Sequence, residues 1–231
     1  MLRLKSLLMG TAMSVLAASG ALAAGNQVYI DQVGNNSNIS VTQSGGDNAV
    51  GDSAAAAILH GNNQSITVSQ IGAVNTAALN VQGAGTTVQS TVAGNTNTVN
   101  IDCGSGSVNK ASACADSNIT ANITGSNNDI GINAGSKSTH STEVTGDRNT
   151  LHTDSITSNL LGARSTITAT GSDNAVTVTQ HGPAGLNGFE ATVALTGSSN
   201  TVGVAQSGTV DSKVNITSVG SNNTISVISG N

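Results

Sequence analysis

Apolar and polar residues alternate along short segments that recur through most of the chain. Four segments share one frame: a glycine, apolar residues five and seven positions later, glutamine at the ninth position and glycine at the eleventh. These four begin at Gly34, Gly61, Gly171 and Gly197, and looser copies begin at Gly94, Gly125, Gly146 and Gly220. Alternation with a period of two indicates β-strands, and its recurrence indicates a repeat architecture.

The frame predicts which side chains point inward. Positions five, seven and nine have the same parity, so on a strand Ile39, Val41 and Gln43 face one side of the sheet. Glycine at the start of the frame and asparagine three positions later supply the turn between strands. The starting glycines are 21 to 33 residues apart, which suits one turn of a β-solenoid with loops of variable length. We therefore expect an all-β solenoid of about eight strand-turn-strand repeats with cross-β stacking, in which each repeat needs its neighbours to bury its apolar face.

An inward glutamine is costly alone, because a buried amide without partners loses its hydration. Identical amides that stack from rung to rung hydrogen-bond each other instead, as in cross-β assemblies. We therefore predict a self-assembly ladder along the stack. Its candidate members are Gln32, Gln43, Gln70, Gln180, Gln206, Asn48, Asn75, Gly34, Gly45 and Gly72.

The composition supports a thin structure. Charged residues make up 8% of the chain and aromatic residues 1%, whereas about 25% of residues are charged in typical domains. Few large side chains are present to fill a thick core, yet the chain lacks the high charge of disordered proteins. Strand-forming Val, Ile and Thr together with turn-forming Gly and Asn favour many short strands.

The first residues resemble a secretory signal peptide. Arg3 and Lys5 precede the mostly apolar stretch 7–16, and small residues at Ala21 and Ala23 predict cleavage after Ala23, with Ala24 as the alternative. We therefore expect a signal peptide at 1–23, a single β-repeat domain at 24–231, and a secreted protein without membrane insertion. Five basic and twelve acidic residues follow Ala23, giving a net charge of −7 that argues against a nucleic-acid partner.

Cys103 and Cys114 are the only cysteines. Because an exported chain meets an oxidising compartment, we predict a disulfide that closes the inserted loop 104–113. Cys103 also stands at the ninth position of its frame, where glutamine stands in the strong copies. The four histidines, at 60, 140, 152 and 181, lack metal-ligand spacing and are expected in exposed loops or turns. We therefore expect no enzyme activity, no metal and no cofactor.

Two further interpretations of the polar residues are weaker. A calcium-binding repeat is suggested only once, by the Gly45-Gly46-Asp47 segment. We expect four aspartates to polarise turns instead, and hypothesise that they slow premature aggregation. They are Asp47, Asp129, Asp147 and Asp173. An ice-binding array would need aligned Thr-x-Thr pairs, but the pairs at 96–98, 166–168 and 177–179 fall at different offsets in the repeat.

The repeats resemble those of the curlin family, the subunits of curli fibres. Gln43-x-Gly45-x-x-Asn48 and Gln70-x-Gly72-x-x-Asn75 match the family pattern, and the match is best over residues 26–82. This resemblance implies an amyloid-forming subunit that is secreted unfolded through an outer-membrane channel and supports adhesion and biofilm matrix. Its implied partners are further copies of the chain and another curlin subunit. Glutamine is missing from the ninth position in the four looser copies, so a major and a minor or nucleating role both stay open.

Two functions remain in competition. The first is a structural subunit that assembles into an extracellular curli-like fibre. The second is a monomeric secreted β-solenoid adhesin that binds a surface carbohydrate or protein. The repeats start close to the predicted cleavage site and continue to the last residues of the sequence without a polar cap, which favours end-to-end stacking. Residues 136–165 are the least regular, and we expect a bulged rung or a protruding loop there.

Overall fold

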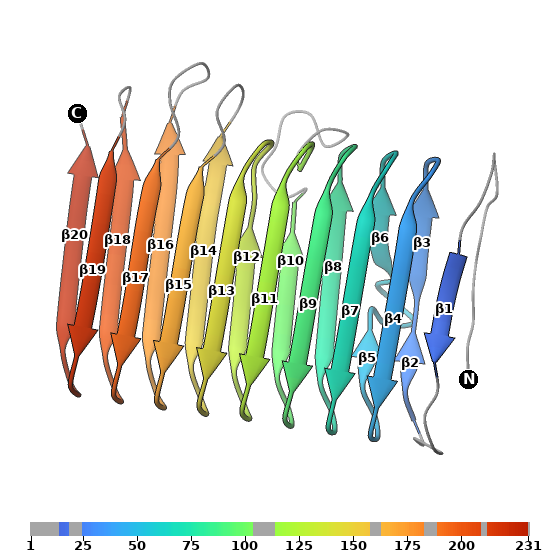
Figure 1. The fold of residues 1–231 in the computed structure, drawn as a ribbon, viewed down its shortest axis with the longest axis horizontal. Helices are drawn as coiled ribbons and strands as arrows, with labels where there is room; N and C mark the ends of the chain where they lie inside the picture. The colour runs from blue at the N-terminus through green and yellow to red at the C-terminus, as the bar shows by residue number, and fades with distance from the viewer. Residues whose placement is uncertain are drawn as a thin grey trace.

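A computed structural model describes residues 14–18, 25–103, 114–157, 163–182, 189–208 and 212–230. In these residues the regular secondary structure consists of β-strands alone (Figure 1). The strands lie side by side along the long axis of the molecule, and β1 and β20 lie at its opposite ends.

The strands form two parallel sheets, one behind the other in Figure 1. Sheet A contains, in order, β1 (Ser14–Ala18), β4 (Asn38–Ser44), β7 (Ser65–Ile71), β9 (Thr87–Ala93), β11 (Asn118–Thr124), β13 (Thr139–Thr145), β15 (Arg164–Thr170), β17 (Glu190–Thr196) and β19 (Lys213–Val219). Sheet B contains β2 (Gln27–Val28), β3 (Ile30–Val33), β5 (Ala49–Val50), β6 (Ala57–His60), β8 (Thr76–Gln82), β10 (Thr98–Asp102), β12 (Asp129–Asn133), β14 (Thr150–Thr157), β16 (Ala175–Gly182), β18 (Thr201–Ser207) and β20 (Thr224–Gly230). The chain alternates between the sheets, so the predicted all-β solenoid is confirmed.

The core lies between the two sheets and is one continuous cluster of small and branched apolar side chains. The inward parity predicted from the repeat is confirmed in both sheets. Ile39 and Val41 are buried in β4, and Val176, Val178 and Gln180 are buried in β16. The intervening residues point outward, because side chains alternate between the two faces of a strand.

Two kinds of corner join the sheets. An A-to-B corner leads from a sheet A strand to the following sheet B strand, and a B-to-A corner leads back. Every A-to-B corner from 45–48 to 220–223 begins with glycine and ends with asparagine, whereas the B-to-A corners vary, as in GNNS at 34–37 and GAGT at 83–86. At twelve corners the third residue is not glycine and has φ between 55° and 61°, a left-handed conformation that turns the chain sharply.

The eight glycines that define the sequence repeat belong to both kinds of corner. Gly34 and Gly61 begin B-to-A corners, whereas the other six begin A-to-B corners. Corners of the A-to-B kind are 21 to 31 residues apart when counted by themselves. Part of the irregular spacing in the sequence therefore comes from combining two different positions of the rung.

The expected irregularity at residues 136–165 is wrong for the part of this segment that is described. Strand β13 pairs along its full length with β11 and with β15. The polar residues that disturb the sequence pattern alternate between faces like all others: His140 and Thr142 point inward, and Glu143 points outward. The rungs are therefore regular, but their interior is more polar than elsewhere.

At the N-terminal end, β1 pairs in parallel with β4, from Ser14 opposite Asn38 to Ala18 opposite Thr42. β1 lies within the segment 1–23 predicted as a signal peptide. The rest of that segment, including the predicted cleavage site, lies outside the described residues.

Candidate assembly site inside the solenoid

The predicted glutamines meet only in two separate pairs. In sheet A, Gln43 Nε2 donates to Gln70 Oε1 at 2.8 Å. In sheet B, Gln180 Nε2 donates to Gln206 Oε1 at 2.7 Å. Gln70, Gln180 and Gln206 are fully buried, so their stacked amides replace hydration as expected for a ladder.

These pairs do not join into one ladder. Gln70 lies opposite Val92 in β9, and Gln206 lies opposite Ser229 in β20. Gln32 lies opposite Leu59 and donates to the carbonyl of Gly34 at 3.0 Å instead. The physical reason is that glutamine follows both kinds of corner at the same offset, which places the two pairs in different sheets.

A continuous ladder exists, and it is built from asparagine. The last residue of every A-to-B corner is an asparagine, which is buried from Asn48 to Asn200, whereas the end members Asn26 and Asn223 are half-buried. From Asn75 onward, each Nδ2 donates to the Oδ1 of the preceding asparagine at 2.9 to 3.0 Å. The ladder comprises Asn26, Asn48, Asn75, Asn97, Asn128, Asn149, Asn174, Asn200 and Asn223. Asn48 and Asn75, which the sequence placed in the predicted ladder, are two of its members.

Each asparagine from Asn48 to Asn174 uses its whole amide. Asn128, for example, donates to Asn97 Oδ1 at 3.0 Å and to the carbonyl of Gly146 in the next rung at 2.8 Å. Its Oδ1 accepts both the backbone N–H and the Nδ2 of Asn149. One side chain therefore links three successive rungs and leaves no buried amide group unsatisfied.

The sequence-based prediction included Asn48 and Asn75 but assigned the asparagines of the other frames to the turn alone, so it did not anticipate a continuous ladder. The signal was nevertheless present, since position three of the frame has the same parity as the inward positions five, seven and nine. Six of the eight frames carry asparagine there, and the two exceptions are Ser37 and Gln64. These exceptions mark the two frames that begin with a B-to-A corner.

The corner glycines lie against the backbone of the next rung. Gly45 and Gly72 begin A-to-B corners, with φ of 103° and 117°, and Gly34 begins a B-to-A corner. A methyl group at Gly72 would overlap the carbonyl oxygen of Gly94. These glycines therefore allow the close stacking that the asparagine ladder needs.

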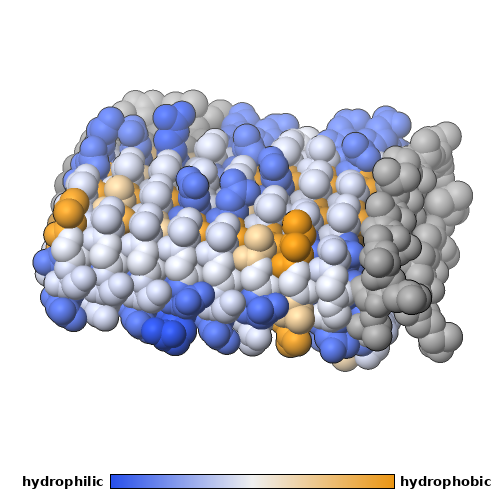
Figure 2. Space-filling model, turned by 60° about the horizontal axis from the view of Figure 1, so that its bottom comes forward, coloured by the Kyte–Doolittle hydropathy of each residue, from blue (hydrophilic) through white to orange (hydrophobic). Residues whose placement is uncertain are grey.

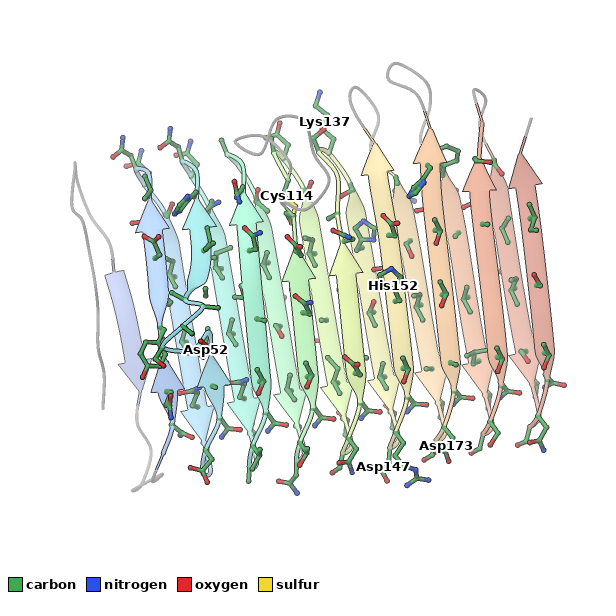
Figure 3. The ribbon with its side chains drawn as sticks, turned by 180° about the vertical axis from the view of Figure 1, so that it is seen from behind. Asp52, Cys114, Lys137, Asp147, His152 and Asp173 are labelled. Carbon is green, nitrogen blue, oxygen red and sulfur yellow. A yellow bond between two sulfur atoms is a disulfide. The ribbon has the colours of Figure 1, made fainter. Side chains whose placement is uncertain are left out.

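Cys103 and Cys114 form a disulfide, and both are buried. The bond lies on the B-to-A side between β10 and β11, where Figure 3 labels Cys114. The loop 104–113, which it was predicted to close, lies outside the described residues. The disulfide fills the core position that glutamine occupies in other rungs.

Several exposed charged side chains form pairs between rungs. Arg148 binds Asp173 through two hydrogen bonds of 2.7 and 2.8 Å at neighbouring A-to-B corners, and its guanidinium lowers the pKa of Asp173. Figure 3 shows Asp147 and Asp173 along this edge. On sheet B, His60 lies 3.4 Å from Asp31 and His181 lies 3.0 Å from Asp154. No group of three or more His, Cys, Asp or Glu side chains among the described residues could hold a metal ion.

The expectation of loop or turn positions for the histidines is wrong, and the expected exposure holds for His152 and His181 but not for His140. All four lie in strands, and His140 is buried in the core face of β13. Burial lowers the pKa of His140 to about 4. It occupies a position that is apolar in the adjacent strand, where Ile119 is its partner.

The outer face of sheet A carries aligned hydroxyl groups. One row comprises Thr120, Ser141, Thr166 and Thr192, and a second comprises Thr124, Thr145, Thr170 and Thr196. Figure 2 shows rows of residues with near-neutral hydropathy along the molecule. The Thr pairs considered for ice binding do not share this face, since 166–168 lies on sheet A and 177–179 on sheet B.

The described part of the chain contains no helix with the length and apolar character to cross a membrane. No protein-family model, no curated protein and no solved structure matches this chain.

Proposed function

We propose that the protein is a structural subunit of an extracellular curli-like amyloid fibre, in which copies of the chain stack end to end along the solenoid axis. The asparagine ladder is the observation that carries this proposal. Each asparagine from Asn75 onward donates to the Oδ1 of the asparagine before it. The Oδ1 of the last member is therefore an acceptor for the asparagine of a further rung.

The two ends of the ladder are complementary. Asn223 donates to Asn200 at 3.0 Å, and no described residue donates to its Oδ1. Asn26 accepts from Asn48 through its Oδ1, and no described residue accepts from its Nδ2. Once β1, which lies in the predicted signal peptide, is removed from the edge of β4, stacking Asn26 of one copy on Asn223 of another continues the ladder, with β19 of one copy beside β4 of the next and β20 beside β2 and β3.

The C-terminal edge has the properties of a pairing surface. β19 and β20 each have one strand neighbour among the described residues. Ile228 in β20 is 83% exposed and Val219 at the end of β19 is 74% exposed. An exposed edge with unpaired backbone groups and apolar side chains is a template for another strand.

One feature favours the second candidate, a monomeric adhesin. The outer face of sheet A presents rows of Thr and Ser hydroxyls on a regular backbone, which suits binding to a polar surface. Such binding needs no stacking, so the state of assembly separates the two functions.

The test blocks the edge without changing the fold. Thr201 donates its backbone N–H to Asn223 in the next rung. Thr201 lies opposite Thr224 in β20. Thr224 and every second residue after it, among them Ser226, therefore direct their backbone N–H groups away from β18 and beyond the last rung. Ser226→Pro removes one such donor at an edge where proline is tolerated, and Ser226→Ala is the matched control.

We expect the purified chain and Ser226→Ala to form fibres that bind thioflavin T and give cross-β diffraction. Ser226→Pro should keep the circular dichroism spectrum of the parent but elongate at least about tenfold more slowly from parent seeds, because each addition loses a backbone hydrogen bond and its register. A parent chain that stays monomeric even with seeds, and instead binds polysaccharide, would replace this proposal with the adhesin.

The curlin resemblance adds partners to this proposal. These are a second curlin subunit and an outer-membrane secretion channel. Faster fibre formation by another curlin in the presence of this chain would assign it a nucleating role.

A further inference from the structure

His140 lies in the middle of the solenoid with both ring nitrogens buried. The residue is 1% exposed, and neither Nδ1 nor Nε2 has a hydrogen-bond partner. A neutral imidazole carries one donor and one acceptor, so this placement leaves two polar atoms without compensation. The ladder corners a few residues away show that the fold satisfies such groups elsewhere.

Two neighbouring hydroxyls share this condition. Ser165 lies opposite His140 in β15, and Thr142 follows His140 on the same inward face. The Oγ atoms of Ser165 and Thr142 are buried and have no hydrogen-bond partner. The central rungs therefore contain a small cluster of buried polar groups without hydrogen-bond partners, each of which destabilises the closed state.

No charged side chain faces His140, because the charged residues of the surrounding strands all point outward: Asp129, Glu143, Asp154 and Arg164. In the sheet A neighbours, the inward residues of β11 are Ile119, Ala121 and Ile123, and those of β15 are Ser165, Ile167 and Ala169. In the facing sheet, the inward residues of β12 include Ile130 and Ile132, and those of β14 include Leu151 and Thr153. None of these side chains titrates or carries a charge, and the other three histidines lie on the outer face of sheet B.

We propose that the rungs from β13 to β15 are an acid-sensitive weak point of the solenoid, at which proton uptake by His140 opens the stack locally while the asparagine ladder holds the rungs on either side. This device does not depend on fibre formation, since it acts within one chain. In an assembled fibre it would place one acid-labile position in every copy.

The direction of the pH effect follows from the burial. Burial lowers the pKa of His140 from 6.5 to about 4, so the opened form binds a proton more readily than the closed form. The closed state is therefore fully favoured above pH 6.5, loses stability as the pH falls from 6.5 to 4, and loses no more below that range. At pH 5 the opening equilibrium should be about 30-fold more favourable than at pH 8.

Hydrogen exchange read by mass spectrometry on the full chain tests this, because it resolves single rungs in either a monomer or a fibre. Protection factors of peptides from β13 and β15 should fall about 30-fold between pH 8 and pH 5, while those from β8 should change less than about threefold. His140→Leu should abolish the difference. The control His152→Gln, on the exposed face of neighbouring β14, should retain it.

A second variant keeps the test informative if His140→Leu folds poorly. Thr142→Val removes one unsatisfied hydroxyl from the same cluster, so it should raise protection of β13 at both pH values and leave the pH dependence intact. The proposal is overturned if β13 in the parent shows the same pH dependence as β8, or if His140→Leu and the parent respond alike. Failure of fibre formation would leave both outcomes measurable.

Discussion

The A-to-B corners and the B-to-A corners connect the same two sheets, but they differ in the side chains that stack at their last position. At the A-to-B side every corner ends in asparagine, and its amide bonds to the corners before and after it. At the B-to-A side the corresponding residue changes from Ser37 to Gln64 and Thr86. Each of these three still donates to a carbonyl of the next rung.

The two kinds of corner differ in how many hydrogen bonds this side chain makes along the solenoid axis. In the A-to-B ladder each amide accepts and donates along the axis, so it propagates from rung to rung. At the B-to-A corners Ser37 and Thr86 each bridge one gap, and the Oε1 of Gln64 has no partner. Insertions follow the same division, because the segments 104–113, 158–162, 183–188 and 209–211 all lie between a sheet B strand and the next sheet A strand. A continuous ladder fixes the length of a corner, and an interrupted one lets it vary.

The largest expected effect is that of an insertion. Placing Gly-Ser-Gly between Ser126 and Asn127, in an A-to-B corner, should lower the free energy of unfolding by about 5 kcal/mol, because it displaces several buried hydrogen bonds of Asn128. The same insertion between Ser136 and Lys137, in the next B-to-A corner, should cost about 2 kcal/mol, from loop entropy and from the bond that Ser138 donates to the Gly135 carbonyl. Urea unfolding of both variants measures the difference, and equal losses would refute the division into two kinds of corner.

A smaller effect is expected from removing one amide. Asn128→Ala should cost about 4 kcal/mol, since it strips partners from the Gly146 carbonyl and from two N–H groups of Asn149. Asn122→Ala, on the exposed face of β11, should change stability by less than about 0.5 kcal/mol. Thermal unfolding distinguishes them. A loss at position 128 no larger than at position 122 would show that the ladder is incidental to stability.

The smallest of these contrasts concerns glycine. Gly125 has φ of 131°, and a methyl group there would overlap the backbone carbonyl of Gly146, so Gly125→Ala should cost about 3 kcal/mol. Gly85 is the third residue of a B-to-A corner, whereas Gly125 is a first residue; Gly85 has φ of 71° and faces the movable carboxylate of Asp116. Its replacement by alanine should cost about 1 kcal/mol, the left-handed strain alone. Gly203→Ala, with no atom near the added methyl, is the control for both.

Strand type, inward parity and parallel stacking were all predictable from the sequence, because a period of two leaves only one way to bury Ile39, Val41 and their equivalents. The cysteine pair could be proposed from export and spacing. The repeat frame could not predict the sheet to which each glutamine belongs, since Gln43 and Gln180 follow different kinds of corner at the same offset. His140 was placed in a loop because a polar residue interrupts the apolar pattern. Only the strand register, which pairs His140 with Ile119, shows that its side chain points into the core.

Because all A-to-B corners have the same length and end in asparagine, a whole rung can be deleted or duplicated in the gene without changing the corner. Removing residues 149–173 would join Arg148 to Asn174 and restore a Gly-Asp-Arg-Asn corner, with β17 then beside β13 and β16 beside β12. A duplication of the same stretch would be equally seamless. Unequal recombination between repeats can therefore lengthen or shorten this protein by whole rungs while the asparagine ladder stays continuous.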